Sequence, residues 1–262
     1  MIIADVHAHI FPEALADKAT VSICSFYAAE LPERPACLAE LMKEHEAAGI
    51  TAGIVCNSAV SAHQVHHIND FIAESIQKAP QYIGFGSVFP GMDGVEEELD
   101  RMVSLGIRGV KIHPDFMKLA IDEPSGIDTY RAIAKRGLPV LFHMGDMRYD
   151  YSAPQRLLNL LRKAPDLQVI AAHFGGWGIW EEALKYPMPE NVVYDTSSTT
   201  PLVAKELVLR MLDAYGIDRM MFGSDFPMWN PGEMVKQIKQ LGLSECEEEK
   251  LFYGNFAKYF AR

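Results

Sequence analysis

The chain has 262 residues, of which 49% are hydrophobic and 23% are charged, and its formal net charge is −11. This composition is typical of a globular protein that can bury a large core. The acidic balance argues against a nucleic-acid partner, because phosphate binding needs a basic surface. No run of 18 apolar residues occurs, so we expect no membrane span and no membrane partner.

Short apolar runs recur along the whole chain. Most are continuous and rich in β-branched or aromatic residues, a pattern that predicts parallel strands buried on both faces. Eight such runs are present, over residues 2–6, 50–56, 82–89, 107–112, 138–142, 167–172, 192–194 and 220–222.

Amphipathic stretches separate these runs and predict helices. They cover residues 37–48, 64–78, 95–105, 127–136, 154–163, 180–185, 202–215 and 232–241, with a final helix over 245–260. Several end in glycine directly before the next strand, as at Gly49, where glycine relieves a left-handed turn. Eight strand–helix units predict an α/β fold, a single (β/α)8 TIM barrel forming one domain over residues 1–262.

The connection after the first predicted strand, residues 10–35, is unusually long. Connections on that side of a barrel often cover the active site, so we expect a long loop there.

The cysteines and the N-terminus bear on the compartment. Cys24, Cys37, Cys56 and Cys246 form no close pair and no metal-knuckle spacing. The N-terminus lacks the basic start and apolar run of a signal peptide. Reduced thiols in a cytoplasmic protein are therefore expected.

Histidine and aspartate gather where the predicted strands end, which is where a barrel carries its active site. In chain order the residues at strand ends are His7, His9, Asn57, Lys111, His113, His143, His173, Asp195 and Asp225. The remaining histidines lie on or beside helical stretches, and we expect them to be surface residues: His45, His63, His66 and His67.

His7 and His9 are two positions apart on a strand, so their side chains point to the same face, and Asp5 shares that parity. Neutral imidazole is a good ligand for zinc and similar metals. The pair supplies half of a tetrahedral shell, to which His143 and Asp225 can add a nitrogen and a carboxylate. The alternative, hydrogen-bonded rim histidines without a metal, stays open at this point.

Six short motifs follow one another along the chain. They are Asp5-Val6-His7-Ala8-His9, Gly109-Val110-Lys111-Ile112-His113-Pro114, Phe142-His143, Ala172-His173-Phe174-Gly175-Gly176, Gly223-Ser224-Asp225-Phe226-Pro227 and Gly254-Asn255-Phe256. In this order they resemble the amidohydrolase superfamily, and within it the amidohydrolase-2 branch that includes aminocarboxymuconate semialdehyde decarboxylase. The resemblance covers essentially the whole chain.

The resemblance implies one divalent metal, usually zinc, bound by His7, His9, His143 and Asp225. It implies that His173 contacts the water or substrate on that metal, or binds a second metal in binuclear members. A second metal needs a carboxylated lysine or a glutamate on strand four, and Lys111 is the candidate. A substrate-binding or structural role for Lys111 is the favoured alternative, and His113 is expected to contact substrate or to support the site.

Two reactions fit this ligand set. A metal lowers the pKa of bound water towards about 7, and Asp225 is the expected acceptor of that proton, with His173 orienting the water. Asp5 is expected to hydrogen-bond the ring of a ligand histidine and fix its tautomer, and a strand-end carboxylate salt-bridged across the barrel is the alternative. The leading expectation is a hydrolase of small amides, esters or lactones, and the alternative is a decarboxylase of a small unsaturated or aromatic acid. A barrel that binds a metal without turnover is disfavoured by the complete ligand set.

The substrate is expected to be a small molecule, with Arg148 pairing with a substrate carboxylate and Trp177 among the aromatic residues around it. Residues after strand ends that form this specificity set are Phe11, Arg148, Tyr149, Tyr151, Trp177 and Trp229. A surface arginine with mutually packed aromatics is the alternative. Dimers are common among enzymes of this kind, so a homodimer is compatible with the sequence.

Overall fold

The computed structural model describes residues 1–30, 32 and 34–260. The chain divides into two compact units. The first unit comprises Met1–Cys56, Lys78–Tyr82 and Thr196–Arg262, and the second comprises Asn57–Gln77 and Ile83–Asp195. Each unit is built from parallel strands and the helices that connect them.

Eight strands lie where the sequence predicts them, and their order in the sheet is the order of the chain. They are β1 Ala4–His9, β2 Ala52–Cys56, β3 Tyr82–Gly86, β4 Gly109–Ile112, β5 Val140–Phe142, β6 Val169–Ala171, β7 Val192–Asp195 and β8 Met220–Met221. Most of their side chains are buried, as expected for strands covered on both faces. Most observed strands are shorter than the predicted apolar runs, because apolar residues continue into the turns that flank them.

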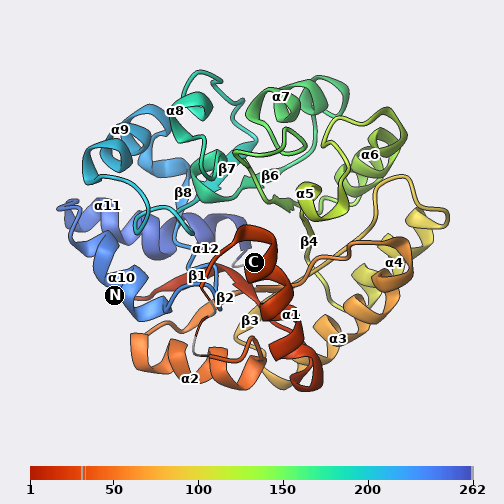
Figure 1. Ribbon diagram of the computed structural model, residues 1–262, viewed down its shortest axis with the longest axis horizontal. Coiled ribbons are helices and arrows are strands. Elements are labelled where there is room, and N and C mark those ends of the chain that lie inside the picture. Colours follow the sequence, from red (N-terminus) through yellow and green to blue (C-terminus); the bar gives the residue numbers. More distant parts are fainter. Residues whose placement is uncertain (31, 33, 261–262) are drawn as a thin grey trace. The chain divides into compact units, whose positions relative to one another are not determined.

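In the first unit, β1 and β2 pair in parallel, from Ala4 opposite Ala52 to His9 opposite Cys56. The two strands approach closely at Gly53, where a Cβ atom would lie 2.4 Å from the carbonyl oxygen of Asp5. Helices α2 (Leu38–Ala48) and α10 (Pro231–Lys239) pack against each other, and Figure 1 shows them together in the first unit. Helix α2 ends at Gly49, which has a φ of +70° as the sequence predicts.

The long connection after β1 differs from the expected loop. Helix α1 (Glu13–Tyr27) occupies 15 of its residues, and Ala16, Thr20 and Cys24 form its buried side. An i, i+4 repeat of small, buried side chains is the helical signal that the sequence contained here. Leu31 and Glu33, which the prediction included, lie outside the described residues.

The second unit contains strands β4 to β7 in parallel register, with Val110 opposite Val140, Val140 opposite Val169 and Val169 opposite Val192. Within this unit α6 and α7 lie outside these strands (Figure 1). Its helices are α3 Val65–Lys78, α4 Val95–Ser104, α5 Pro114–Met117, α6 Ile127–Lys135, α7 Pro154–Lys163 and α8 Trp180–Ala183, with 3-10 turns at Ala62–Gln64, Pro124–Gly126 and His173–Gly175.

The C-terminal part of the first unit holds α9 (Lys205–Tyr215), a 3-10 turn (Ile217–Arg219) and α11 (Glu245–Glu249) before α12 (Asn255–Phe260). A π-helical turn, Lys250–Gly254, joins α11 to α12, so the single helix expected over 245–260 changes its hydrogen-bond pattern midway. Asn255 then donates to the carbonyl oxygens of Ile217 and Met220 at 2.7 and 2.6 Å. These bonds tie α12 to the start of β8.

Among the described residues, no helix has the length and the apolar character that crossing a membrane requires. All four cysteines carry free thiols, and Cys246 is the exposed one.

Candidate metal centre

Three predicted ligands come together in the first unit. His7 Nε2 and His9 Nε2 lie 3.1 Å apart, and each is 3.5 Å from Asp225 Oδ1. In a tetrahedral shell with metal–ligand bonds of 2.0–2.1 Å, neighbouring donor atoms are about 3.3–3.4 Å apart. Two imidazole lone pairs at 3.1 Å repel each other, so a proton or a cation must lie between them. The donor set therefore fits a divalent metal.

The backbone around β8 places Asp225 beside the two histidines. Val6 N donates to the carbonyl oxygen of Phe222 at 2.9 Å, and His9 N donates to that of Phe226 at 2.8 Å. Between these bonds Asp225 N donates to the carbonyl oxygen of His7 at 2.8 Å. The residues after β8 thus continue alongside β1, and Asp225 adopts a left-handed φ of +63°, unusual for a residue with a side chain.

The outer atoms of the three ligands also have partners. His7 Nδ1 lies 3.0 Å from Ser197 Oγ, and His9 Nδ1 lies 3.8 Å from Cys56 Sγ. Asp225 Oδ2 accepts a hydrogen bond from Ser198 Oγ. In the expected hydrolysis this oxygen would accept the proton of water. The Ser198 hydroxyl already occupies one of its lone pairs.

Asp5 and His45 correct two expectations. Asp5 Oδ1 accepts from the backbone amide of His7 at 3.0 Å, so the contact is to the backbone of a ligand histidine and not to an imidazole ring. Asp5 Oδ2 lies 3.1 Å from Nε2 of His45, which was expected on the surface but is 1% exposed. Tyr82 Oη completes the chain at 3.0 Å from His45 Nδ1. A histidine on a helix is buried here because a carboxylate and a phenol supply its hydrogen bonds.

The other three histidines that were expected on the surface lie there. His63, His66 and His67 are exposed, and His66 Nδ1 pairs with Glu98 Oε2 at 2.8 Å.

In the second unit, His143 and His173 face each other from the ends of β5 and β6. His173 Nε2 lies 3.0 Å from His143 Nδ1, and both side chains are buried. His143 Nε2 is 2.9 Å from the carbonyl oxygen of Gly145, which places the proton on Nε2 and the lone pair on Nδ1. The backbone amide of His173 donates to Asp195 Oδ1 at 3.0 Å. His143 as the third nitrogen ligand and His173 as a catalytic group stay predictions.

The end of β4 contributes a buried cluster in the same unit. Lys111 is fully buried and His113 is 4% exposed. The His113 ring stacks on that of His143, with centroids 3.9 Å apart, and its Nδ1 accepts from the amide of Phe116 at the start of α5. These contacts support His113 as a residue that packs against a predicted ligand.

Asp115 is a buried acid that the sequence analysis missed. Burial raises its pKa to about 7, against the opposing hydrogen bond from Ser152. Its Oδ2 lies 4.0 Å from His143 Nε2, and its Oδ1 has no hydrogen-bond partner. The signal available was its place two residues after His113, next to a strand end. His113, Asp115 and His143 are also close enough to group around an ion.

Arg148 lies on the loop after β5. Its Nε and Nη2 donate to the two oxygens of Asp146 at 2.9 and 2.6 Å, and Asp146 is 3% exposed. Sequence reasoning did not identify Asp146, whose spacing of two residues from Arg148 was the available signal. A carboxylate of the chain itself therefore engages the guanidinium, and contact between Arg148 and substrate stays a prediction.

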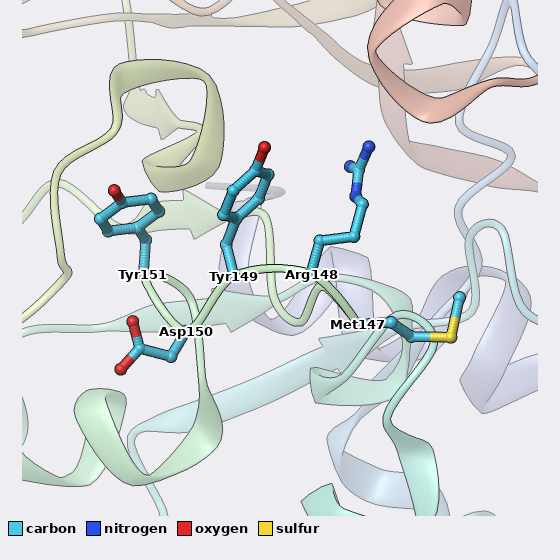
Figure 2. A pocket seen from close by; sticks show the side chains of 5 residues that line it. All are labelled: Met147, Arg148, Tyr149, Asp150 and Tyr151. Carbon is cyan, nitrogen blue, oxygen red and sulfur yellow. The ribbon is translucent and has the colours of Figure 1, made fainter.

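The same loop lines a cavity of about 440 Å³ (Figure 2). Arg148, Tyr149 and Tyr151 project to one side of the loop, whereas Asp150 projects to the other. The guanidinium of Arg148 lies over the Tyr149 ring at 5.3 Å, and the two tyrosine rings stack at 5.9 Å. Trp177, the other predicted substrate contact, is half-buried, and its backbone amide donates to the carbonyl oxygen of Met144 at 2.7 Å.

Two curated relatives match part of the chain. An uncharacterized protein of Sinorhizobium fredii is 26% identical over 200 residues, and the match covers 64% of this chain and 64% of that protein. The 2-amino-3-carboxymuconate-6-semialdehyde decarboxylase of Dictyostelium discoideum is 24% identical over 235 residues, and the match covers 74% of this chain and 65% of that protein. The matches thus span less than two thirds of either relative.

Solved structures resemble the whole chain. An uncharacterized TIM-barrel protein of Bordetella bronchiseptica has a TM-score of 0.78 at 19% identity, covering 100% of this chain and 99% of that one. A manganese-bound 5-carboxyvanillate decarboxylase of Novosphingobium aromaticivorans has 0.74 at 19%, covering 100% and 97%. A 2-pyrone-4,6-dicarboxylic acid hydrolase of Pseudomonas putida, so named provisionally, has 0.72 at 19%, covering 99% and 97%.

These likenesses show the fold that the sequence predicts, an eight-stranded TIM barrel. The family model described as amidohydrolase matches residues 4–262, nearly the full length. The chain belongs to the amidohydrolase family.

Proposed function

We propose that this protein is a metal-dependent decarboxylase of a small unsaturated or aromatic carboxylic acid. The observation that carries the metal dependence is the convergence of His7 Nε2, His9 Nε2 and Asp225 Oδ1 within 3.5 Å of one another. The sequence favoured hydrolysis over decarboxylation, whereas the proposal favours decarboxylation because of the relatives. The curated relative with a named activity is a decarboxylase, and one of the similar structures is another.

His7, His9 and Asp225 would hold one divalent metal, and His143 is proposed as a further nitrogen ligand on the family resemblance. The bound metal would supply a positive charge that neutralises and orients an anionic substrate. Zinc is the metal expected from the nitrogen-rich ligand set. Manganese is the alternative, since a similar structure carries it.

The chain's own residues would position the substrate. His173 is proposed, on the family resemblance, as the group that contacts the reacting part of the substrate, and its Nε2 lies 3.0 Å from Nδ1 of His143. Lys111, His113, Arg148 and Trp177 are proposed as substrate-binding residues. A second metal on carboxylated Lys111 is the less favoured arrangement.

Hydrolysis of a lactone, ester or amide is the second candidate. The similarity to the pyrone dicarboxylic acid hydrolase of Pseudomonas putida favours it. In this reaction Asp225 would accept a proton from water. The hydrogen bond that Ser198 donates to Asp225 Oδ2 opposes that transfer, because it occupies a lone pair of the oxygen that would take the proton.

A substrate screen separates the two reactions. Purified protein loaded with zinc or with manganese would be incubated with aromatic and unsaturated acids, and with lactones and amides of similar size. Carbon dioxide release and ring opening or amide cleavage would be followed in parallel. We expect carbon dioxide from at least one acid, lost in His7→Ala and retained in His63→Ala, which alters an exposed histidine. Cleavage of a lactone or amide without carbon dioxide from any acid would refute decarboxylation and establish the second candidate.

A further inference from the structure

Two neighbouring serines after β7 contact two different candidate ligands. Ser197 Oγ lies 3.0 Å from His7 Nδ1, and Ser198 Oγ donates to Asp225 Oδ2. Both serines are buried, with Ser197 fully so. The serines contact Nδ1 of His7 and Oδ2 of Asp225, whereas the candidate ligands converge through Nε2 and Oδ1. Each serine therefore contacts the atom that is not proposed to bind the metal.

Ser197 and Ser198 lie in the turn after β7 and not on the strand itself. Ser198 has a φ of +46°, in the left-handed region that residues with a side chain rarely adopt. The turn therefore directs both hydroxyls towards the ligand cluster. A strained conformation of this kind persists where the surrounding contacts hold it.

The direction of the Ser198 hydroxyl is determined by a tryptophan. Trp229 Nε1 lies 2.9 Å from Ser198 Oγ, and an indole N–H can only donate. Ser198 therefore accepts from Trp229 and directs its own proton to Asp225 Oδ2. This chain of two hydrogen bonds holds the carboxylate in the rotamer that presents Oδ1 to His7 and His9.

The loop that carries Trp229 is itself anchored. Arg34 Nη1 donates to the carbonyl oxygen of Pro227 at 3.1 Å, and its Nε donates to Glu44 at 3.1 Å. Asn230 donates to the other oxygen of Glu44. Helix α2 thereby holds the loop after β8 from both sides of Trp229, which restricts the position of the indole.

We propose that Ser197 and Ser198 are positioning residues that pre-organise the metal centre, Ser197 by orienting the His7 imidazole and Ser198, with Trp229, by orienting the Asp225 carboxylate. This inference rests on the proposed metal dependence. With Nε2 of His7 as the ligand atom, Nδ1 carries the proton and donates it to Ser197. Removing such a partner of a ligand typically weakens metal binding about 10–100-fold.

Metal affinity of the apoprotein tests the proposal without any substrate. Zinc and manganese would each be titrated calorimetrically into wild type, Ser197→Ala, Ser198→Ala and Trp229→Phe. We expect both alanine variants to bind about 10–100-fold more weakly and Trp229→Phe to lose less, because Ser198 itself remains. Ser197→Thr, which keeps a hydroxyl, should restore the affinity.

Two further variants separate hydroxyl loss from general damage. Ser198→Gly removes the hydroxyl while relieving the left-handed backbone, so weak binding by this variant assigns the effect to the hydrogen bond. Ser75→Ala is the matched control, a buried serine of α3 whose hydroxyl donates to Phe71 O at 2.7 Å, and it should bind metal as wild type does. If Ser198→Ala fails to fold, Ser198→Gly and Trp229→Phe carry the same test.

The outcomes distinguish this inference from the function on which it rests. Wild type that binds neither metal overturns the proposed metal dependence itself. Wild type that binds, alongside Ser197→Ala and Ser198→Gly variants of equal affinity, overturns the positioning role alone. Equal weakening of Ser75→Ala also overturns it, since any buried hydroxyl would then have the same effect.

Discussion

Asp5 carries a fully buried carboxylate that four hydrogen-bond donors surround. The backbone amides of His7 and Ser224 approach Oδ1 at 3.0 and 2.9 Å, and the Ser224 hydroxyl and His45 approach Oδ2. A buried charge is tolerated when its hydrogen bonds are complete. Asp5 bonds to His7 on β1 and to Ser224 in the loop after β8, so its carboxylate holds this strand and this loop together.

Replacing His45 should therefore destabilise the fold. His45→Ala leaves Asp5 with one donor fewer and opens space beside it, and we expect the free energy of unfolding to fall by about 2–4 kcal/mol. Tyr82→Phe removes only the hydroxyl next to His45 Nδ1 and should cost about 1 kcal/mol. Urea denaturation measures both. Equal stability of His45→Ala and wild type would show that Asp5 does not depend on this partner.

At the scale of elements, the close approach of β1 and β2 governs the position of the candidate ligands on β1, His7 and His9. Gly53→Ala would place a Cβ atom 2.4 Å from the Asp5 carbonyl oxygen, so the strands must move apart. We expect a loss of roughly 1–3 kcal/mol in unfolding free energy, as for other overpacked sites, together with weaker metal binding.

Gly254→Ala is the control for this substitution. A Cβ at Gly254 would meet no atom closer than 3.5 Å, an ordinary contact. This variant should have the same free energy of unfolding and the same metal affinity as wild type. Identical behaviour of the two alanine variants in denaturation and in calorimetry would contradict the steric argument.

Helices α3 and α4 meet at Glu98, whose side chain is almost completely buried. Burial acts to raise its pKa, but hydrogen bonds from Arg101 and Asn69 outweigh it and hold the pKa of Glu98 below its usual range. A carboxyl with a lowered folded pKa stabilises the fold fully above its unfolded pKa, about 4.3, and this contribution is lost as the pH falls through the folded pKa.

The stability difference between wild type and Glu98→Gln should accordingly shrink as the pH falls below about 4.3. Denaturant unfolding of both proteins between pH 3 and pH 7 measures it. Glu97→Gln, an exposed neighbour on the same helix, should show no such dependence. If the stability difference between wild type and Glu98→Gln grew on acidification, the pKa of Glu98 would be raised in the fold and not lowered.

For the whole molecule, metal removal should lower thermal stability. A ligand that binds the folded state at 100 times its Kd stabilises it by about 2.7 kcal/mol, which corresponds to roughly 5–10 °C in Tm for a chain of this size. Calorimetric scans before and after treatment with a chelator, and after adding metal back, measure the change. His7→Ala should show no shift under any of these treatments, whereas His63→Ala should follow wild type.

Residues that bind a metal are easier to predict from sequence than residues that support the binding. His7, His9 and Asp225 stand at strand ends, and histidine and aspartate are uncommon enough there for their positions to indicate a site. Ser198 has no such signal, because serine is common in turns and its reach depends on a φ of +46°. Asp115 and His45 were missed for a related reason, since burial of a polar residue depends on partners distant in the chain.

The order of strands and helices follows from local information. Apolar runs with β-branched residues and the amphipathic stretches between them determine eight strand–helix units, and parity along β1 places His7 and His9 on one face. These properties depend on residues a few positions apart, so the barrel fold and the pairing of His7 with His9 can be predicted without the structure.

The hydrogen-bond partners of those candidate ligands become apparent only in the folded chain. Asp225 is 218 positions from His7 in the chain, yet the pairing of β1 with the segment after β8 brings its Oδ1 to 3.5 Å from His7 Nε2. The hydroxyls of Ser197 and Ser198 meet the same cluster from a third segment. Contacts of this kind depend on backbone turns and on the closing of long loops, which the periodicity of a sequence does not encode, and so only the folded chain shows which donors orient each ligand.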